Sequence, residues 1–265
     1  MVTLSAIFTP DQPPEQILPV AAAAEAAGMT HLWVWEDCFK ESGIATATAM
    51  LAATSRINVA IGLLPVPLRN VALTAMEIAT VARLFPGRLT AGIGHGVQEW
   101  MSQVGARAES PLTLLREYTT ALYALLHGET VTTHGRYVHL DRVGLDWPPL
   151  TVPPLLVGGI RARTVSLAGE LSDGVIIPGG VSPQEVRAAV GYFGDGRATR
   201  LDNGPGEIVV FIAAPQDSPA ADIAAVVNEY AAAGATHVAV NAAEDDADLV
   251  RFTGFLAREV GPLVR

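Results

Sequence analysis

Short apolar runs alternate along the chain with longer, alanine-rich runs of helical period. The apolar runs are rich in Val, Ile and Leu and are continuous rather than alternating, which is typical of parallel strands covered on both faces. They predict strands at residues 2–8, 31–37, 57–64, 88–94, 153–159, 173–180, 207–214 and 236–242.

The longer runs between them predict helices. Several of these segments begin with proline or a capping residue and end at glycine. One example begins at the capping residue Ser110, followed by Pro111, and ends at Gly128. The predicted helices cover residues 13–28, 44–55, 70–85, 110–128, 162–171, 182–200, 218–234 and 246–260.

One stretch breaks this rhythm. Residues 129–149, "ETVTTHGRYVHLDRVGLDWPP", alternate with period two around a glycine and predict a small hairpin or ordered loop. About eight βα units in 265 residues predict an α/β fold, a (β/α)8 TIM barrel in one domain over 1–265, with an insert at about 128–150 before the fifth strand. The alternative is a doubly wound open sheet, whose five or six strands would leave units unplaced.

Composition narrows the classes of protein. Half of the residues are apolar and 17% are charged, so the chain can bury a large core. The net charge is −10 with no basic run, which argues against nucleic acid as a partner. Cys38 is the only cysteine, and we find no secretory leader and no apolar stretch of ~20 residues, so we expect a cytoplasmic protein without membrane association. The single lysine, Lys40, beside many Ala, Gly and Arg residues indicates a GC-rich bacterial source.

The ends of the predicted strands are the candidate site positions, because TIM-barrel active sites lie there. His95 stands between Gly94 and Gly96 after the fourth strand. The glycines would let a flat ligand approach the backbone, and the imidazole would serve as acid or base. The alternative is a structural histidine bonded to a loop carbonyl.

Two other strand ends carry candidate chemistry. In Glu36-Asp37, strand alternation directs one carboxylate to the barrel axis and the other to the helices. The alternative is a helix cap or a salt bridge within the loop. Gly158-Gly159 precede a helix with Arg161 and Arg163 in its first turn, a pattern that suits an anion site or an ordinary turn.

The remaining aromatic and motif signals are weaker. We assign Trp33 and Trp35 to packing, Trp100 to a pocket wall, and Trp147 to the insert or to a cap over the barrel. The six histidines form no HExxH motif and there is no cysteine ligand set, so we predict no metal. There is no GxSxG elbow and no P-loop.

Four segments together resemble a known family, the bacterial luciferase-like flavin and deazaflavin enzymes. They are "AGMTHLWVWED", the strand–helix–strand stretch from "IGLLPVPLRN" to "GRLTAGIGHG", the helix and insert from "LLREYTT" to "DWPP", and "PPLLVGGIRARTVSLAGELSDGVIIPGG". Their order and spacing carry the resemblance from about Gly28 to Gly180.

The resemblance implies a TIM barrel that binds FMN or coenzyme F420 at its mouth. The cofactor phosphate would lie at Gly158, Gly159, Arg161, Arg163 and Thr164, and the ring on a bulge at Gly62, Leu63 and Leu64 with a non-prolyl cis peptide, near Gly94. The resemblance places Asp37 at the polar edge of the ring and makes proton transfer by His95 plausible, so these two are the expected catalytic residues. Thr9, Gln98 and Trp100, at or just after strand ends, are the expected substrate-pocket residues. Cys38 stands where relatives often have histidine.

The function that the resemblance favours is hydride transfer between F420 and a small organic substrate, in an actinobacterial homodimer that associates through the helices beside strands two and three. One alternative is an FMN-dependent luciferase-like monooxygenase. Another is a non-catalytic flavin- or deazaflavin-binding barrel, which the cysteine at position 38 keeps open. A phosphate-binding lyase or isomerase would need a catalytic lysine, and Lys40 lies in a predicted loop.

Overall fold

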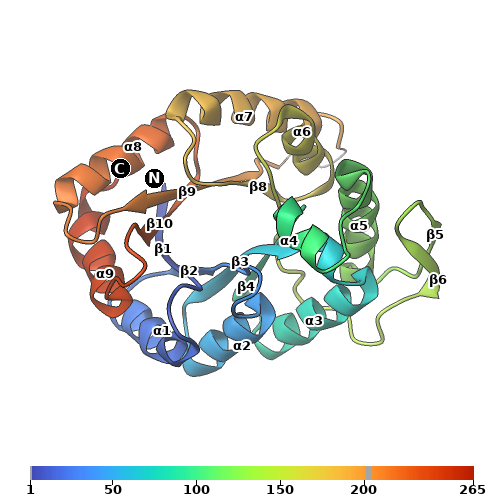
Figure 1. Cartoon of the computed structure of the whole chain (residues 1–265), viewed down its shortest axis with the longest axis horizontal. Helices are drawn as coiled ribbons and strands as arrows, with labels where there is room; N and C mark the ends of the chain where they lie inside the picture. The colour runs from blue at the N-terminus through green and yellow to red at the C-terminus, as the bar shows by residue number, and fades with distance from the viewer. Residues whose placement is uncertain (1, 201–203) are drawn as a thin grey trace.

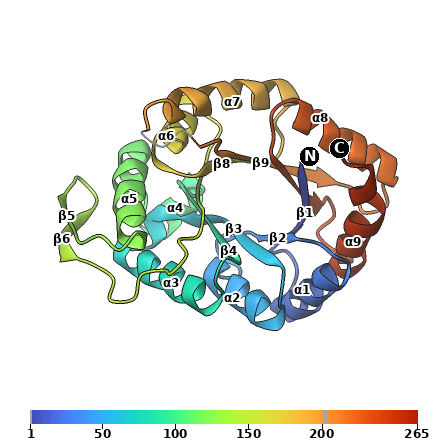
Figure 2. The same cartoon turned by 180° about the vertical axis from the view of Figure 1, so that it is seen from behind.

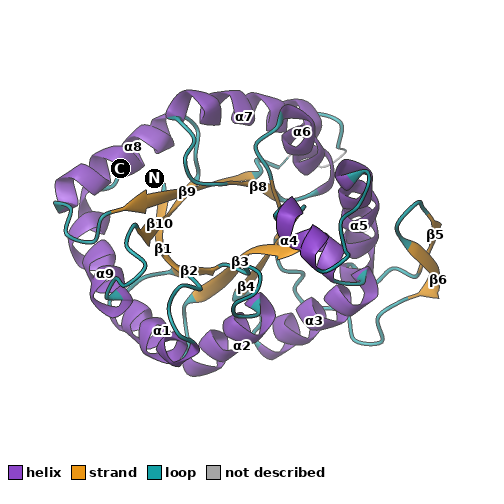
Figure 3. Ribbon diagram, viewed as in Figure 1, coloured by secondary structure: helices purple, strands orange, loops and turns teal. Residues whose placement is uncertain are grey.

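Eight parallel strands close into a barrel inside a ring of helices (Figures 1 and 3). The computed structural model describes residues 2–200 and 204–265. Around the barrel the strands follow the order β1-β10-β9-β8-β7-β4-β3-β2. Their bounds are β1 Thr3–Phe8, β2 His31–Val34, β3 Asn58–Pro65, β4 Leu89–Gly94, β7 Leu155–Gly158, β8 Gly174–Ile177, β9 Glu207–Ala214 and β10 His237–Ala242. The predicted TIM barrel is confirmed.

The helices surround the strands, and all of the described helices except the short α4 lie on the outside of the barrel (Figure 1). They are α1 Ile17–Ala26, α2 Gly43–Ala53, α3 Val71–Leu84, α4 Gln98–Gln103, α5 Pro111–Leu126, α6 Ala162–Leu171, α7 Pro183–Arg197, α8 Ala220–Ala232 and α9 Leu249–Phe255. All coincide with predicted segments except α4, which the sequence pattern did not predict. None of the described helices is long and apolar enough to cross a membrane.

The barrel interior is filled by a small cluster of its own, separate from the larger core between strands and helices. Trp33 of β2 and Phe211 of β9 meet edge to face there, with ring centroids 5.2 Å apart. Near the amino ends of the strands, the buried His237 accepts a hydrogen bond from the Trp33 indole at 3.2 Å and lies 2.7 Å from the Ser5 hydroxyl. Phe211 and Ile176 of this cluster also line a cavity at the carboxyl ends of the strands, so the cluster lies directly beneath that cavity.

The ladder between β3 and β4 is interrupted at that carboxyl end. Its register shifts between Ile61 and Leu64, and the Gly62–Leu63 peptide is cis, as the family resemblance implied. A Cβ on Gly62 would lie 2.6 Å from Cζ of Phe211 and 2.9 Å from Cε3 of Trp33, so only glycine fits against the two interior rings.

The insert is an antiparallel hairpin, β5 Val131–His134 and β6 His139–Val143. It lies outside the helix ring beside α5 in both views (Figures 1 and 2). The Glu117 carboxylate of α5 accepts hydrogen bonds from the backbone N–H groups of residues 136–138, at 2.8–3.0 Å. Trp147 is 72% exposed and lies 5.3 Å from the Arg83 guanidinium in the last turn of α3, so it does not cap the barrel mouth.

Two glycines allow α6 and α7 to touch backbone to backbone. A Cβ on Gly196 would lie 1.9 Å from the Ser166 carbonyl oxygen, and one on Gly169 would lie 2.1 Å from that of Phe193. Carbonyl groups inside a helix cannot move aside without breaking its hydrogen bonds, so these positions require glycine.

We predict that Gly196→Ala lowers the free energy of unfolding by about 1–3 kcal/mol, the usual range for forced overpacking. Gly191→Ala, on the same helix with nothing within 4 Å of its added Cβ, is the matched control. It should be neutral or stabilise by up to about 1 kcal/mol, because alanine restricts the unfolded chain. Urea denaturation measures both, and equal effects would contradict the close contact.

Candidate active site

A cavity of about 510 Å³ lies at the carboxyl ends of the strands. Backbone of Gly62, Gly158, Gly159 and Gly179 forms part of its wall. Aromatic side chains from β9, from the α4 segment and from the loop after β2 form another part, namely Phe211, Trp100 and Trp35. Asp37 and His95 add polar groups to this largely apolar lining.

A second cavity of about 560 Å³ adjoins the first and shares His95, Gly96, Gly159 and Pro178 with it. Its other walls come from the beginnings of α5 and α6, which include Arg161, Arg163 and Thr164. The two cavities therefore form one continuous site, with apolar rings at one end and a helix N-terminus at the other.

His95 lies where the two cavities meet. Its Nε2 is 3.2 Å from the Thr164 hydroxyl, while its Nδ1 is buried and makes no hydrogen bond to another of the described residues. Burial lowers the pKa of this imidazole below its usual 6.5; the Pro111 backbone acts in the opposite direction and the Arg161 charge adds to the lowering. His95 is therefore neutral at pH 7 and can accept a proton.

Asp37 faces the first cavity from the loop after β2. Burial raises the pKa of its carboxyl group, Lys40 opposes this rise, and the negative charge of Asp11 adds to it. Burial and the neighbouring carboxylates Glu36 and Asp37 also raise the pKa of the Cys38 thiol, so Cys38 is protonated and is no nucleophile at pH 7. Asp37 and His95 thus give the first cavity a carboxyl group and a neutral imidazole that are candidates for proton transfer.

Arg161 and Arg163 supply positive charge at the second cavity. Both are exposed, and neither guanidinium has an ion pair or hydrogen bond to another of the described residues. Most other arginines do have such partners, for example Arg69, Arg88 and Arg116. Two free guanidinium groups beside the first turn of α6 make this end of the site suitable for an anion.

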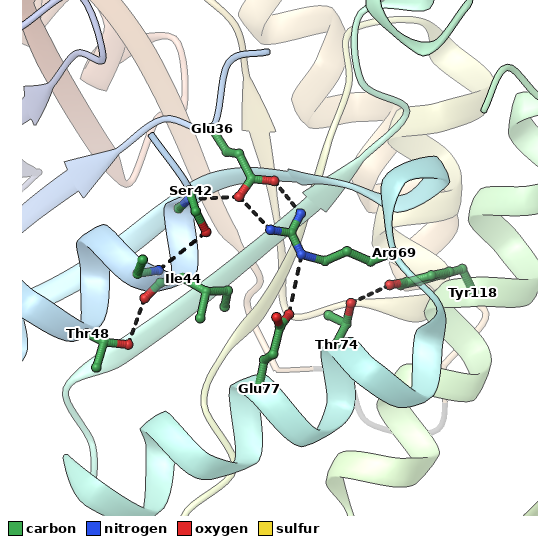
Figure 4. A network of polar contacts seen from close by, with 10 residues as sticks. Glu36, Ser42, Ile44, Thr48, Arg69, Thr74, Glu77 and Tyr118 are labelled. Carbon is green, nitrogen blue, oxygen red and sulfur yellow. Dashed lines mark hydrogen bonds and ion pairs between the residues drawn. The ribbon is translucent and has the colours of Figure 1, made fainter. Parts of the chain in front are cut away.

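A buried ion-pair network holds the loop that carries Asp37 (Figure 4). Glu36 pairs with Arg69 through both carboxylate oxygens, and its Oε2 also accepts a hydrogen bond from the Gly43 N–H, at 2.7 Å, where α2 begins. The Arg69 Nε lies 3.3 Å from Glu77 of α3. Glu36 therefore points toward the helices and fixes the loop against α2 and α3.

The structure brings most of the expected site residues together. Asp37, Gly62, Leu63, His95, Trp100, Gly158 and Gly159 line the first cavity, and Gln98, Arg161, Arg163 and Thr164 line the second. The Gln98 amide donates to the His95 and Gly96 carbonyls at 3.3 Å, so it supports the histidine loop.

Three expected residues lie outside the lining of both cavities. Leu64 is 1% exposed and packs in the core between strands and helices. Gly94 lies beneath Leu63, since a Cβ on this glycine would be only 2.7 Å from the leucine Cδ2. Thr9 is buried, and its carbonyl accepts a hydrogen bond from the Gln12 N–H at 3.3 Å.

Other lining residues were missed by sequence reasoning. Phe211 and Ile176 sit inside continuous apolar strands, where the sequence pattern does not say which side chains face the barrel axis. Trp35, expected to serve packing, does contact Phe211, with centroids 5.9 Å apart, but it also lines the cavity. Among the described residues, no group of three or more His, Cys, Asp or Glu side chains could hold a metal.

The chain belongs to the luciferase-like monooxygenase family, whose model matches residues 2–258. It is 29% identical over 209 residues to a 5,10-methylenetetrahydromethanopterin reductase of Methanolobus tindarius, covering 79% of this chain and 63% of that protein. It is 31% identical over 182 residues to an F420-dependent glucose-6-phosphate dehydrogenase of Mycobacterium avium, covering 63% and 54%. The matched parts thus span about half to two thirds of these relatives. An actinobacterial source stays a prediction.

Solved structures share the fold over the whole chain. An F420-dependent secondary alcohol dehydrogenase in complex with an F420-acetone adduct superposes with a TM-score of 0.89 at 18% identity, and each chain is covered in full. The oxygenating constituent of a Pseudomonas putida Baeyer-Villiger monooxygenase in complex with FMN gives a TM-score of 0.80 at 14% identity, covering 100% and 99%. At these identities the likeness shows the barrel fold alone.

We predict that Arg69→Met lowers the free energy of unfolding by about 3–5 kcal/mol, because it leaves the Glu36 carboxylate buried without its counter-ion. The side chains of Arg69 and Glu36 are only 14% and 7% exposed. Arg251→Met is the control, since its pair with Asp217 is about 70% exposed on both sides and should contribute less than about 1 kcal/mol. Similar losses in the two variants would show that burial does not govern the Glu36 pair.

Proposed function

We propose that this chain is an oxidoreductase that transfers a hydride between coenzyme F420 and a small organic substrate. The observation that carries the proposal is the continuity of the site: a largely apolar cavity adjoins a second one that holds two arginines at the start of α6, both unpaired among the described residues. The F420-dependent activity named for the Mycobacterium avium relative supports this choice of cofactor.

The residues present fit such a cofactor. A planar tricyclic ring suits a lining that combines glycine backbone with aromatic side chains, and the cis peptide after Gly62 is part of that lining. The cofactor phosphate would take hydrogen bonds from Arg161, Arg163 and the N–H groups that open α6. When bound, the deazaflavin ring supplies a two-electron hydride carrier.

The chain itself would supply proton transfer and the exclusion of water. We assign the proton to Asp37 or to neutral His95, which both line the first cavity. Trp35, Trp100 and Phe211 would shield the reacting atoms from bulk water. Gln98 would act indirectly, by holding the carbonyls of the His95 loop.

Cofactor binding tests the proposal most simply. We expect purified apo-protein, titrated with oxidised F420 and with FMN, to bind F420 more tightly, with fluorescence quenching as the measurement. Arg163→Ala should raise the Kd for F420 by about tenfold or more through loss of a charged hydrogen bond to phosphate. Arg187→Ala, an exposed arginine on α7 outside both cavities, should leave the Kd unchanged.

The same titration distinguishes the alternative functions. Preference for FMN would favour a luciferase-like monooxygenase. Tight F420 binding without any substrate turnover would favour a non-catalytic binding barrel. Binding of neither cofactor at micromolar concentration would contradict the proposed function.

The assignment of proton transfer to Asp37 or His95 predicts the kinetics of variants at these positions. Asp37→Asn and His95→Gln should bind F420 normally, and the variant that removes the proton-transfer group should lose ~10²-fold or more in kcat. Cys38→Ser should retain kcat, because the Cys38 thiol is protonated and takes no part in proton transfer.

If His95 is the base, the rate of substrate oxidation should fall as the pH drops below 6.5, since the protonated imidazole cannot accept a proton. Full activity in both Asp37→Asn and His95→Gln would contradict the assignment.

We also propose that the chain forms a homodimer through α2 and α3. The outer face of α3 exposes Leu73 and Met76, at 47% and 57%, and the exposed positions of α2 are alanines such as Ala45 and Ala52. Such an uncharged face on two adjacent helices is typical of an interface between subunits.

Light scattering after gel filtration tests this interface. We expect the wild-type mass to be that of a dimer and Met76→Asp to be monomeric. Leu18→Asp on α1, at a position that is 51% exposed, should remain dimeric. A monomeric wild-type protein would contradict the proposal.

A further inference from the structure

We infer that the substrate is a small, uncharged and largely apolar alcohol, or the carbonyl compound that it forms. The inference rests on the proposed function and concerns the same site. It is carried by the distribution of charge and of apolar surface around the first cavity.

The first cavity offers no cation to an anionic substrate. Its described lining residues include the ionisable residues Glu36, Asp37 and His95, and no lysine or arginine. Arg69 lies close by, but both oxygens of Glu36 already engage it. A phosphate or carboxylate placed here would be desolvated next to Asp37 with no compensating charge, which is strongly unfavourable.

The cations of the whole site are at its other end. Arg161 and Arg163 line the second cavity and do not line the first. If the cofactor phosphate occupies that end, no free guanidinium remains among the described lining residues for a second anionic group. The charge pattern thus separates an anion-binding end from an end suited to neutral molecules.

Size and polarity limit the substrate further. The cavity of about 510 Å³ has to hold the cofactor ring as well, so the part of it that is left suits a small molecule. Side chains of Trp35, Val97, Trp100 and Phe211 offer it apolar contact. Polar recognition would come from Asp37, His95 and the buried Trp35 indole N–H, which has no hydrogen-bond partner among the described residues. This small set suits one hydroxyl or carbonyl oxygen.

The reaction balances with these groups alone. An alcohol carbon would lose a hydride to the oxidised cofactor, and its hydroxyl proton would pass to Asp37 or His95, which leaves the carbonyl compound. The two electrons leave with the hydride, and both hydrogens are accounted for. The reverse reaction would take the same hydride and proton back.

Three probes that share one ring test the inference: cyclohexanol, trans-4-hydroxycyclohexanecarboxylate and trans-4-aminocyclohexanol. Saturation-transfer NMR on the apo-protein measures binding without cofactor, and F420 reduction by the loaded protein measures kcat/KM. We expect cyclohexanol to bind and to exceed both charged probes at least tenfold in kcat/KM. Preference for the carboxylate or the amine would overturn the inference, as would failure of cyclohexanol to bind.

A pair of variants tests whether the preference for the neutral probe arises at the first cavity. Val97 and Val104 flank α4 and are each 46% exposed, but only Val97 lines the first cavity. Val97→Lys should increase binding of the carboxylate probe several-fold, and Val104→Lys should not. Equal responses in both variants would overturn the inference. Failure of F420 to bind would refute the proposed function instead, because the NMR readout needs no cofactor.

Discussion

Closure of the parallel barrel is the constraint on which the rest of the structure depends. It brings the carboxyl ends of all eight strands to one rim, so residues as distant as Asp37, His95 and Phe211 meet around one cavity. The interior rings of Trp33 and Phe211, with His237 below them, fill the barrel from the amino end. The site is therefore a chamber at the carboxyl end of the barrel, with the interior cluster beneath it.

In the described part of the chain, the site has one end with unpaired positive charge and one end without it. Arg161 and Arg163 are left unpaired among the described residues at the start of α6, whereas Arg69 is committed to Glu36 and Glu77. The buried pair neutralises the Glu36 carboxylate, which points toward the helices, and it holds the loop that presents Asp37 (Figure 4). The unpaired arginines are therefore available for the phosphate of the proposed cofactor. Because Arg69 is already paired, no cation is left among the described residues at the first cavity, which suits the inferred neutral substrate.

Much of this was predictable from the sequence, because strand ends in a parallel barrel are site positions whatever the details. Strand β9 was predicted at its observed bounds, and Gly62, His95 and Gly159 all reach the site. The rest depended on contacts between distant segments. Arg69 meets Glu36 across 33 positions, Phe211 faces inward by a register that apolar runs do not reveal, and α4 is too short to show helical periodicity. For the same reason the sequence could not show that Thr9, Leu64 and Gly94 lie outside the cavity lining. All three stand at or near the carboxyl ends of strands, but they do not face the cavities.

A crystal structure of the protein with oxidised F420 would show directly whether the two cavities hold one cofactor. We expect the phosphate against Arg161, Arg163 and the first turn of α6, the ring against the Gly62–Leu63 peptide, and an open space between the ring and Trp100. A ring bound outside the first cavity, or a phosphate held away from α6, would contradict this expectation.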